Sequence, residues 1–222
     1  MDKNKLPYGT QFTPGQINLK ELLDIVYAND GSDDTKSLIN DIIDHFFSTQ
    51  AEEQRKNLAS NCRTALVGYQ IIVPGGGTHM TSFGRQLHSI DTDMMRYEML
   101  AKHILLNLNG MALIEAIRDI ERTGYRVTNE SIVETLNSRG FCLSKTGNAQ
   151  SAMKNWLEKG GVLSGWRIDE NKLNELTGLS DTELDLLRTL KKEQYYFFRA
   201  LCNLGSENFQ KATDIRNLAM IT

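Results

Sequence analysis

Residues 58–72, LASNCRTALVGYQII, decide the fold because their apolar pattern occurs twice in the chain. The apolar positions follow the spacing of one helix face and end in an apolar pair suited to a strand. The same skeleton returns 91 residues later, and this match predicts an internal repeat of helix, tight turn and strand. The paired positions are Leu58/Ala149, Cys62/Met153, Ala65/Trp156, Leu66/Leu157, Tyr69/Gly160, Ile71/Val162 and Ile72/Leu163.

The opposite face of the two predicted helices is polar. Polar outer faces are usually only solvated, so the informative feature is that a cation and small hydrogen-bonding groups recur at equivalent positions. These residues are Ser60, Arg63 and Thr64 in the first copy, and Ser151, Lys154 and Asn155 in the second.

A glycine-rich segment follows the first copy. Pro74 and three glycines lead into Thr78 and His79. Because only glycine takes positive φ without steric cost, three glycines between two short extended segments predict a flexible hairpin tip. Residues 160–168 repeat this plan in a shorter form, as a strand, a very short turn and a returning strand.

Further helices are predicted around the two copies from amphipathic spacing and capping residues. Residues 90–108 are apolar over much of their circumference, and we expect a buried helix that connects the copies. Residues 5–15 predict an ordered arm packed on a domain, with DNA contact by this arm as the alternative. The other predicted helices, with their cap residues, are 18–27 (Asn18), 35–49, 54–69, 111–123 (Gly124), 128–139 (Thr128) and 148–159.

This order of helices, strand, glycine-rich wing and strand, closed by the Thr81-x-x-Gly84-x-x-Leu87 pattern, resembles the winged-helix superfamily of DNA-binding helix-turn-helix domains. The resemblance covers about 70 residues in each copy, and it implies a recognition helix that enters the DNA major groove. It implies a mainly α fold with short β-hairpin wings, built from tandem winged-helix units.

The domain organisation that we expect has three parts. Residues 1–90 form the arm and the first unit, residues 91–170 form the connecting helix and the second unit, and residues 171–222 begin a third helical unit. Helical runs are predicted at 181–190, at 193–204 and from 212 onward. The chain stops before a third helix or wing, so we expect it to be a fragment of a longer protein.

Charge is unevenly distributed along the 222 residues, whose net charge is −3. Residues 1–50 hold four Lys and Arg against eight Asp and Glu, whereas residues 139–172 hold six against three. An acidic chain is unpromising for nucleic-acid binding, but a local basic face matters more than the global sum. The second recognition-like segment is the basic part of this chain.

The cellular compartment and the state of the cysteine thiols can be predicted from the composition and from the cysteine spacing. No window approaches the ~18 consecutive apolar residues of a membrane span, and no apolar region follows the charged N-terminus, so a cytoplasmic protein without membrane contact is expected. The widely spaced Cys62, Cys142 and Cys202 predict buried thiols rather than disulfides or a zinc site.

No catalytic constellation is evident. The four histidines lie on separate segments, and the glycine run lacks the Gly-Lys-Ser/Thr of a phosphate-binding loop. The tripeptide Glu170-Asn171-Lys172 matches half of a nuclease core, but the aspartate on a preceding strand is missing. We expect no catalytic residue, metal ligand or cofactor in this chain.

Sequence-specific recognition of double-stranded DNA is the predicted function. Arg reads guanine, Asn reads adenine, and Ser or Thr reaches phosphate or base. Tandem units of this kind resemble the recognition domains of restriction endonucleases that separate recognition from cleavage, which implies attachment to a larger effector in a restriction or phage-defence system. The predicted DNA-binding residues are Arg55, Lys56, Ser60, Arg63, Thr64, His79, Lys145, Asn148, Ser151, Lys154 and Asn155.

Two alternatives remain, a transcriptional regulator and a winged-helix adaptor that binds protein. A symmetric footprint from a dimer would favour the regulator, and failure to bind DNA at low salt would favour the adaptor. If DNA is bound, the second helix is expected to attract phosphate more strongly than the first, because Glu52 and Glu53 partly cancel the cations of the first.

Overall fold

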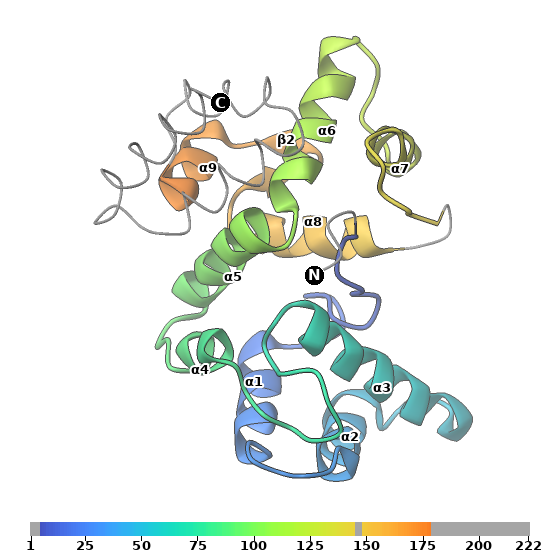
Figure 1. The fold of residues 1–222 in the computed structure, drawn as a ribbon, viewed down its shortest axis with the longest axis vertical. Coiled ribbons are helices and arrows are strands. Elements are labelled where there is room, and N and C mark those ends of the chain that lie inside the picture. Colours follow the sequence, from blue (N-terminus) through green and yellow to red (C-terminus); the bar gives the residue numbers. More distant parts are fainter. Residues whose placement is uncertain (1–4, 145–147, 179–222) are drawn as a thin grey trace, which may run out of the picture. The chain divides into compact units, whose positions relative to one another are not determined.

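The computed structural model describes residues 5–144 and 148–178, and this part of the chain is mainly helical with one two-stranded antiparallel sheet (Figure 1). The chain divides into two compact parts, Met1–Glu170, called the main body here, and Asn171–Thr222. The runs predicted from residue 181 onward lie outside the described residues. The elements are α1 (Leu19–Ala28), α2 (Lys36–Ile42), the π-helix η1 (Ile43–Phe47), α3 (Glu52–Gly68), α4 (Ser82–His88), α5 (Asp93–Asn107), α6 (Gly110–Arg122), α7 (Asn129–Ser138), α8 (Ala149–Lys159), β1 (Leu163–Ser164), β2 (Arg167–Ile168) and α9 (Glu170–Thr177).

The three predicted cap residues Asn18, Thr128 and Gly124 are confirmed. The Asn18 side chain accepts hydrogen bonds from the first backbone N–H groups of α1, and Thr128 forms a reciprocal capping box with Ser131 at the start of α7. Gly124 follows α6 with φ of +75°, a left-handed conformation that glycine adopts without a Cβ clash.

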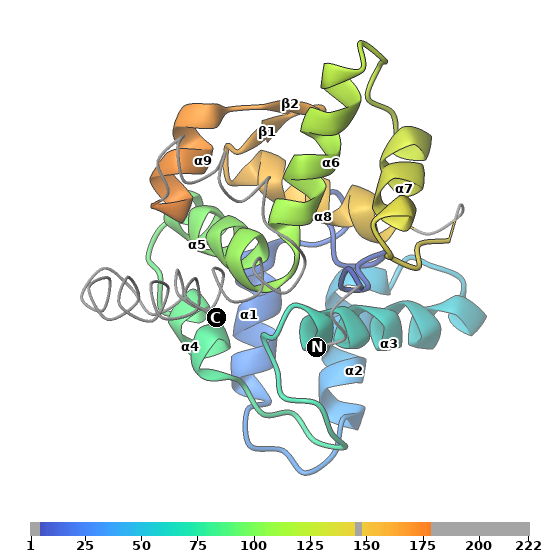
Figure 2. The ribbon, with the colours of Figure 1, turned by 45° about the horizontal axis from the view of Figure 1, so that its top comes forward.

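The first half of the main body, residues 5–90, packs α1, α2 and α3 together, and α4 lies against α1 (Figures 1 and 2). The glycine loop, residues 73–80, joins α3 to α4. The expected strand, wing and strand are reduced to isolated antiparallel bridges, Ile72 to Met80 and Ser32 to Thr78. The second bridge attaches the glycine loop to the turn between α1 and α2.

Residues 82–88 form α4, which the sequence interpretation did not include. The Thr81 hydroxyl accepts a hydrogen bond from the Gly84 N–H at 2.9 Å and so caps this helix. Gly84 brings its backbone against the Ile71 carbonyl oxygen, which a Cβ at this position would overlap.

The second half, residues 91–170, packs α6, α7 and α8 before the hairpin of β1 and β2. Leu163 pairs with Ile168, and Gly165 takes φ of +62° in the turn. The predicted strand, short turn and returning strand are confirmed here. The predicted division near residue 90 falls within the main body, and it stays a prediction.

The two copies of the repeat share their backbone geometry. The N–H groups of Ile71 and Val162, 91 residues apart, donate to the carbonyls of Leu66 and Leu157, each at 2.9 Å. The preceding helix ends also match, since Tyr69 donates to Ala65 and Gly160 donates to Trp156. Except for the first pair, Leu58 and Ala149, both members of every predicted apolar pair are buried.

Helix α5 connects the two halves as predicted, and it contacts α4, α6 and α8. The helix is not buried all round, because Met94 and Met95 are exposed, and it buries one cation, Arg96. The Arg96 guanidinium is held by the Asp93 carboxylate and the Ile90 carbonyl, which offset part of the cost of burying a cation.

Two further expectations need correction. Residues 35–49 do not form one regular helix, because the turn at Ile43–Phe47 is a π-helix that carries Phe47 into the core.

Cys62 is buried, and burial raises its pKa to about 12, but Cys142 is exposed. Cys202 lies outside the described residues.

None of the described helices is long and apolar enough to cross a membrane by itself. Helices α5 and α6 meet the length and composition only as a pair, and that pair is bent by 80°.

Candidate nucleic-acid interface

The outer face of α3 is a polar stripe. Lys56, Asn57 and Thr64 are exposed, and Ser60 is half-buried between them along the helix. The Thr64 hydroxyl donates to the Ser60 carbonyl at 2.9 Å, so its oxygen keeps acceptor capacity toward solvent. Glu53 lies one turn before Lys56 and is also exposed, as the sequence predicted for the acidic start of this helix.

Arg63 turns away from this stripe toward the glycine loop. Its Nη2 donates to the carbonyl oxygens of Gly75 and Gly77, at 2.6 and 3.0 Å. These two bonds fix the loop against α3, and they occupy the part of the guanidinium that would pair with guanine. The structure therefore gives Arg63 a loop-holding contact in place of the base contact expected from sequence.

The other predicted residues of the first half also have defined places. Arg55 Nε donates to the Gln50 carbonyl at 2.7 Å, which holds this side chain back toward the start of α3. His79 is exposed in the glycine loop, and its ring lies close to the backbone of Gly77.

Lys154 in α8 makes contacts analogous to those of Arg63. Its Nζ lies 2.8 Å from a carboxylate oxygen of Glu158 and 5.5 Å from the ring centre of Trp166 in the β1–β2 turn. Glu158 also accepts a hydrogen bond from the Gly165 N–H of that turn at 2.7 Å. The side chain of Lys154 is 17% exposed, so its charge is mostly covered. Lys154 therefore does not provide the stronger phosphate attraction that was expected for this helix.

The rest of the α8 outer face is neutral and polar. Asn148 is exposed just before the helix, and Asn155 is half-buried. The Ser151 hydroxyl donates to the Asn129 side chain at 2.9 Å, which joins α8 to the start of α7. Lys145 lies outside the described residues.

One residue of this surface was missed by sequence reasoning. Asn57 stands 91 residues before Asn148, which was selected, and the repeat offset alone would have identified it. The two outer faces then share three hydrogen-bonding pairs at equivalent positions: Asn57/Asn148, Ser60/Ser151 and Thr64/Asn155.

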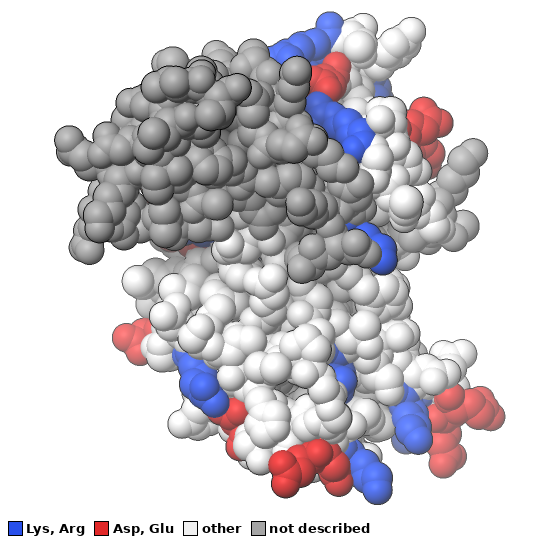
Figure 3. Space-filling model, in the orientation of Figure 1, with Lys and Arg blue, Asp and Glu red and all other residues white. Residues whose placement is uncertain are grey.

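Charges of both signs are mixed on the face of the molecule that Figure 3 shows. Figure 3 shows Lys and Arg interspersed with Asp and Glu on the visible face, without a broad area of one sign over the described part of the chain. Lys56 on α3, Arg126 between α6 and α7, and Arg167 on β2 are exposed cations that form no ion pair with another described residue.

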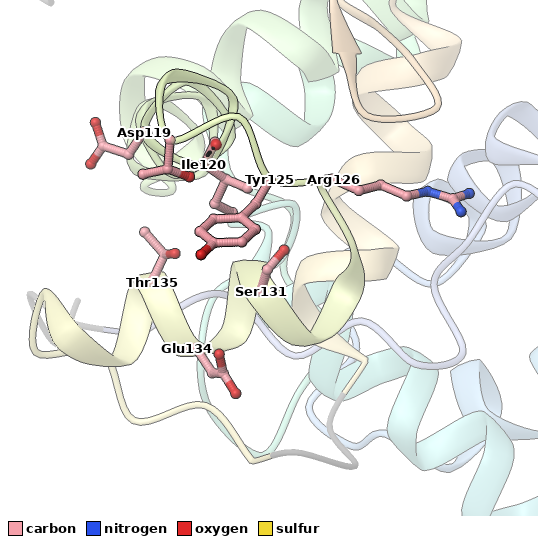
Figure 4. Close-up of a pocket in the computed structure, with 8 residues that line it drawn as sticks. Asp119, Ile120, Tyr125, Arg126, Ser131, Glu134 and Thr135 are labelled. Carbon is pink, nitrogen blue, oxygen red and sulfur yellow. Dashed lines mark hydrogen bonds between the residues drawn. The ribbon is translucent and has the colours of Figure 1, made fainter.

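A pocket of about 600 Å³ lies between α6, α7 and their connecting loop (Figure 4). The ring of Tyr125 points between the two helices, and the Arg126 side chain points away from it. The groups best suited to chemistry are already held, because Ser131 belongs to the α7 capping box and Asp119 pairs with Arg139.

Two further observations bear on catalysis and metal binding. Glu170, from the nuclease-like tripeptide, forms an ion pair with the buried Arg118. Within the described ranges, no group of three His, Cys, Asp or Glu side chains is placed to hold a metal ion. Comparisons of the chain with protein-family models, with curated proteins and with solved structures gave no match.

Proposed function

We propose that the main body consists of two winged-helix units in tandem and recognises double-stranded DNA through the outer faces of α3 and α8. The main support is the set of three hydrogen-bonding pairs, Asn57/Asn148, Ser60/Ser151 and Thr64/Asn155, at equivalent positions of the repeat, with Asn148 at the N-cap of α8 and the other five residues within the two helices. Each helix follows two others and precedes a hairpin or loop, which agrees with the order of elements in a winged-helix unit.

The chemistry of these pairs suits base reading more than charge attraction. Asn donates to and accepts from adenine in a bidentate pair, while Ser and Thr hydroxyls serve either base or phosphate. Arg63 and Lys154 have a supporting task in this proposal, because they hold the loop and hairpin that flank the two recognition helices.

Phosphate contacts fall to the exposed cations. Lys56 lies in the polar stripe of α3, and Arg167 lies on the hairpin that follows α8. Each phosphate contact contributes about 0.9 to the slope of log affinity against log salt. Few such cations predict a shallow salt dependence for this acidic chain.

We further propose that this chain supplies DNA specificity to a larger restriction or phage-defence protein, and that it has no nuclease activity by itself. Glu170 supports the second statement, because its carboxylate is committed to Arg118. A transcriptional regulator with the same DNA-binding surface is the alternative within this class.

A protein-binding adaptor is the second candidate function. The observation that favours it is the mixed-sign surface of Figure 3, since DNA-binding faces are usually strongly positive. The adaptor and the DNA-binding module make opposite predictions in a low-salt binding experiment.

Selection of bound sites from a random duplex library tests the proposal directly. Asn57→Ala and Asn148→Ala should each relax base preference at one position of the selected site, at a cost of about 1–3 kcal/mol. Asn40→Ala is the matched control, because Asn40 is exposed on α2 and belongs to neither candidate recognition helix.

Salt dependence provides a second measurement. Lys56→Ala should weaken binding to all sequences alike and reduce the salt slope by about one. Absence of duplex binding by the parent chain at low salt would overturn the proposal and favour the adaptor. Unchanged base preference in both Asn variants would exclude these stripes as the reading surface.

A further inference from the structure

The N-terminal arm, residues 5–15, is packed between the two halves of the main body (Figures 1 and 2). Phe12 is fully buried at the centre of this contact. Its ring centre lies 4.8 Å from that of Tyr69, at the end of α3, and 4.9 Å from that of Trp156 in α8. One arm residue therefore touches the end of one candidate recognition helix and the middle of the other.

The backbone of the arm strengthens this contact. The Trp156 indole Nε1–H donates to the Phe12 carbonyl oxygen at 2.8 Å, in a buried position. A Cβ on Gly9 would lie 2.8 Å from the Ala152 Cβ and 3.2 Å from the Tyr69 hydroxyl. Gly9 is thus required for the arm to pass between α3 and α8 at this distance.

The contact is not duplicated by the repeat. Tyr69 is equivalent to Gly160, and Trp156 is equivalent to Ala65, so the arm joins two positions that do not correspond. Gly160 instead packs against α5, where a Cβ would overlap Ala101. Each copy of the repeat therefore contributes one candidate recognition helix, but a single arm segment packs between α3 and α8. This segment defines one asymmetric arrangement of the two helices.

We infer that Phe12 is a positioning residue that sets the separation and rotation of the two DNA subsites read by α3 and α8. This inference rests on the proposed function, since it assigns a spacing to the surface proposed there. One base pair of extra spacer moves the second subsite by about 3.4 Å and about a tenth of a helical turn. If Phe12 holds α3 and α8 rigidly, the altered spacing should lower the DNA affinity. If the junction between the helices is loose, the affinity should change little.

The claim that Phe12 fixes the arrangement of α3 and α8 can be tested without DNA. Spin labels at Gln54 in α3 and Lys159 in α8, both exposed, report the distance between these helices when Cys142 and Cys202 are replaced by serine. The parent should give one narrow distance distribution, and Phe12→Ala should broaden or shift it. Tyr8→Ala is the matched control, because this second aromatic residue of the arm is 42% exposed.

Trp156→Phe provides a milder variant in case Phe12→Ala fails to fold. It keeps an aromatic ring beside Phe12 but removes the indole N–H that holds the Phe12 carbonyl. We expect it to broaden the distance distribution less than Phe12→Ala does. Distributions unchanged from the parent in folded Phe12→Ala and Trp156→Phe chains would overturn the inference.

The specificity part uses the selected site with one base pair inserted or deleted between its two subsites. The parent should lose roughly tenfold in affinity, comparable to a mismatch, and Phe12→Ala less than about threefold. Equal losses in both proteins would overturn the inference even if the variant were less stable. A parent that bound no duplex would overturn the proposed function and with it the assignment of DNA spacing, while the label distances would still show whether Phe12 orders the two helices.

Discussion

Gln70 and Gly161 hold the same left-handed backbone conformation at equivalent positions of the two halves, with φ of 59° and 77°. Each follows the last turn of a helix and lets the chain reverse into an extended segment. A side chain in this conformation costs roughly 1–2 kcal/mol because Cβ crowds the following carbonyl. At this position one copy has Gly161, the residue type that favours a positive φ, and the other has Gln70 in a strained conformation.

Exchange of these two residues has opposite expected effects. Gln70→Gly should raise the free energy of unfolding by about 0.5–1 kcal/mol, because relief of strain exceeds the added entropy of the unfolded chain. Gly161→Gln should lower it by roughly 1–2 kcal/mol. Urea unfolding of both variants provides the comparison, and changes of the same sign would contradict the shared conformation.

Arg63→Ala should loosen the glycine loop. Loss of two hydrogen bonds to the Gly75 and Gly77 carbonyls is expected to cost about 1–2 kcal/mol and to speed hydrogen exchange in residues 73–80. Lys56→Ala, on the same helix, is the control and should change stability by less than about 0.5 kcal/mol. If loop exchange stayed at the parent rate, the two carbonyl contacts would not be holding this loop in solution.

Gly84→Ala should be strongly destabilising. The added methyl group would overlap the backbone carbonyl of Ile71. This carbonyl cannot move without disturbing the turn that follows α3. We expect a loss of about 3 kcal/mol, at the upper end of overpacking effects. Gly15→Ala is the control, since a Cβ there has no neighbour within 4 Å. Similar melting temperatures for the two variants would contradict the close approach.

Asp30 should contribute to acid sensitivity. Burial raises its pKa, but the Met80 N–H, the Arg85 guanidinium and the nearby His79 outweigh burial and hold the pKa below the ordinary value of an aspartate. A lowered pKa in the folded state stabilises the protein above about pH 4, and this stabilisation is lost as the pH falls through the folded-state value.

Asp30→Asn is the corresponding variant. It should lower the free energy of unfolding at pH 7 by about 1–3 kcal/mol and flatten the decline of stability below pH 4. Unfolding curves between pH 2 and pH 7 compare it with the parent chain. A variant that lost stability with falling pH as steeply as the parent would show that other carboxylates cause the acid sensitivity.

Local signals predicted most helices and both copies of the repeat. Capping residues such as Asn18 and Thr128 act within one turn, so their effect is visible in sequence. Helix α4 escaped prediction although its Thr81 cap is local, because the close fit of Gly84 against Ile71 is a tertiary contact that spacing does not show. The burial of Arg96 in α5 was not predicted, since the Asp93 and Ile90 groups that hold its guanidinium could not be identified from spacing.

The helices that carry the candidate site were predicted from sequence, but the directions of several of their side chains were not. The sequence identified α3 and α8 and their polar faces correctly. Long cationic side chains can reach either solvent or a neighbouring loop, and spacing along one helix does not distinguish these directions. Arg63 and Lys154 therefore lie against the glycine loop and the β1–β2 hairpin, while the shorter Asn57 was overlooked.

The buried hydrogen bond between Trp156 and Phe12 spans 144 residues of the chain. During synthesis Phe12 is made before its partner in α8, and most of the main body is made between them. The arm consequently cannot complete its packing until α8 has formed. Docking of the arm therefore follows the formation of α8, so this buried contact is made late relative to the helices that flank it.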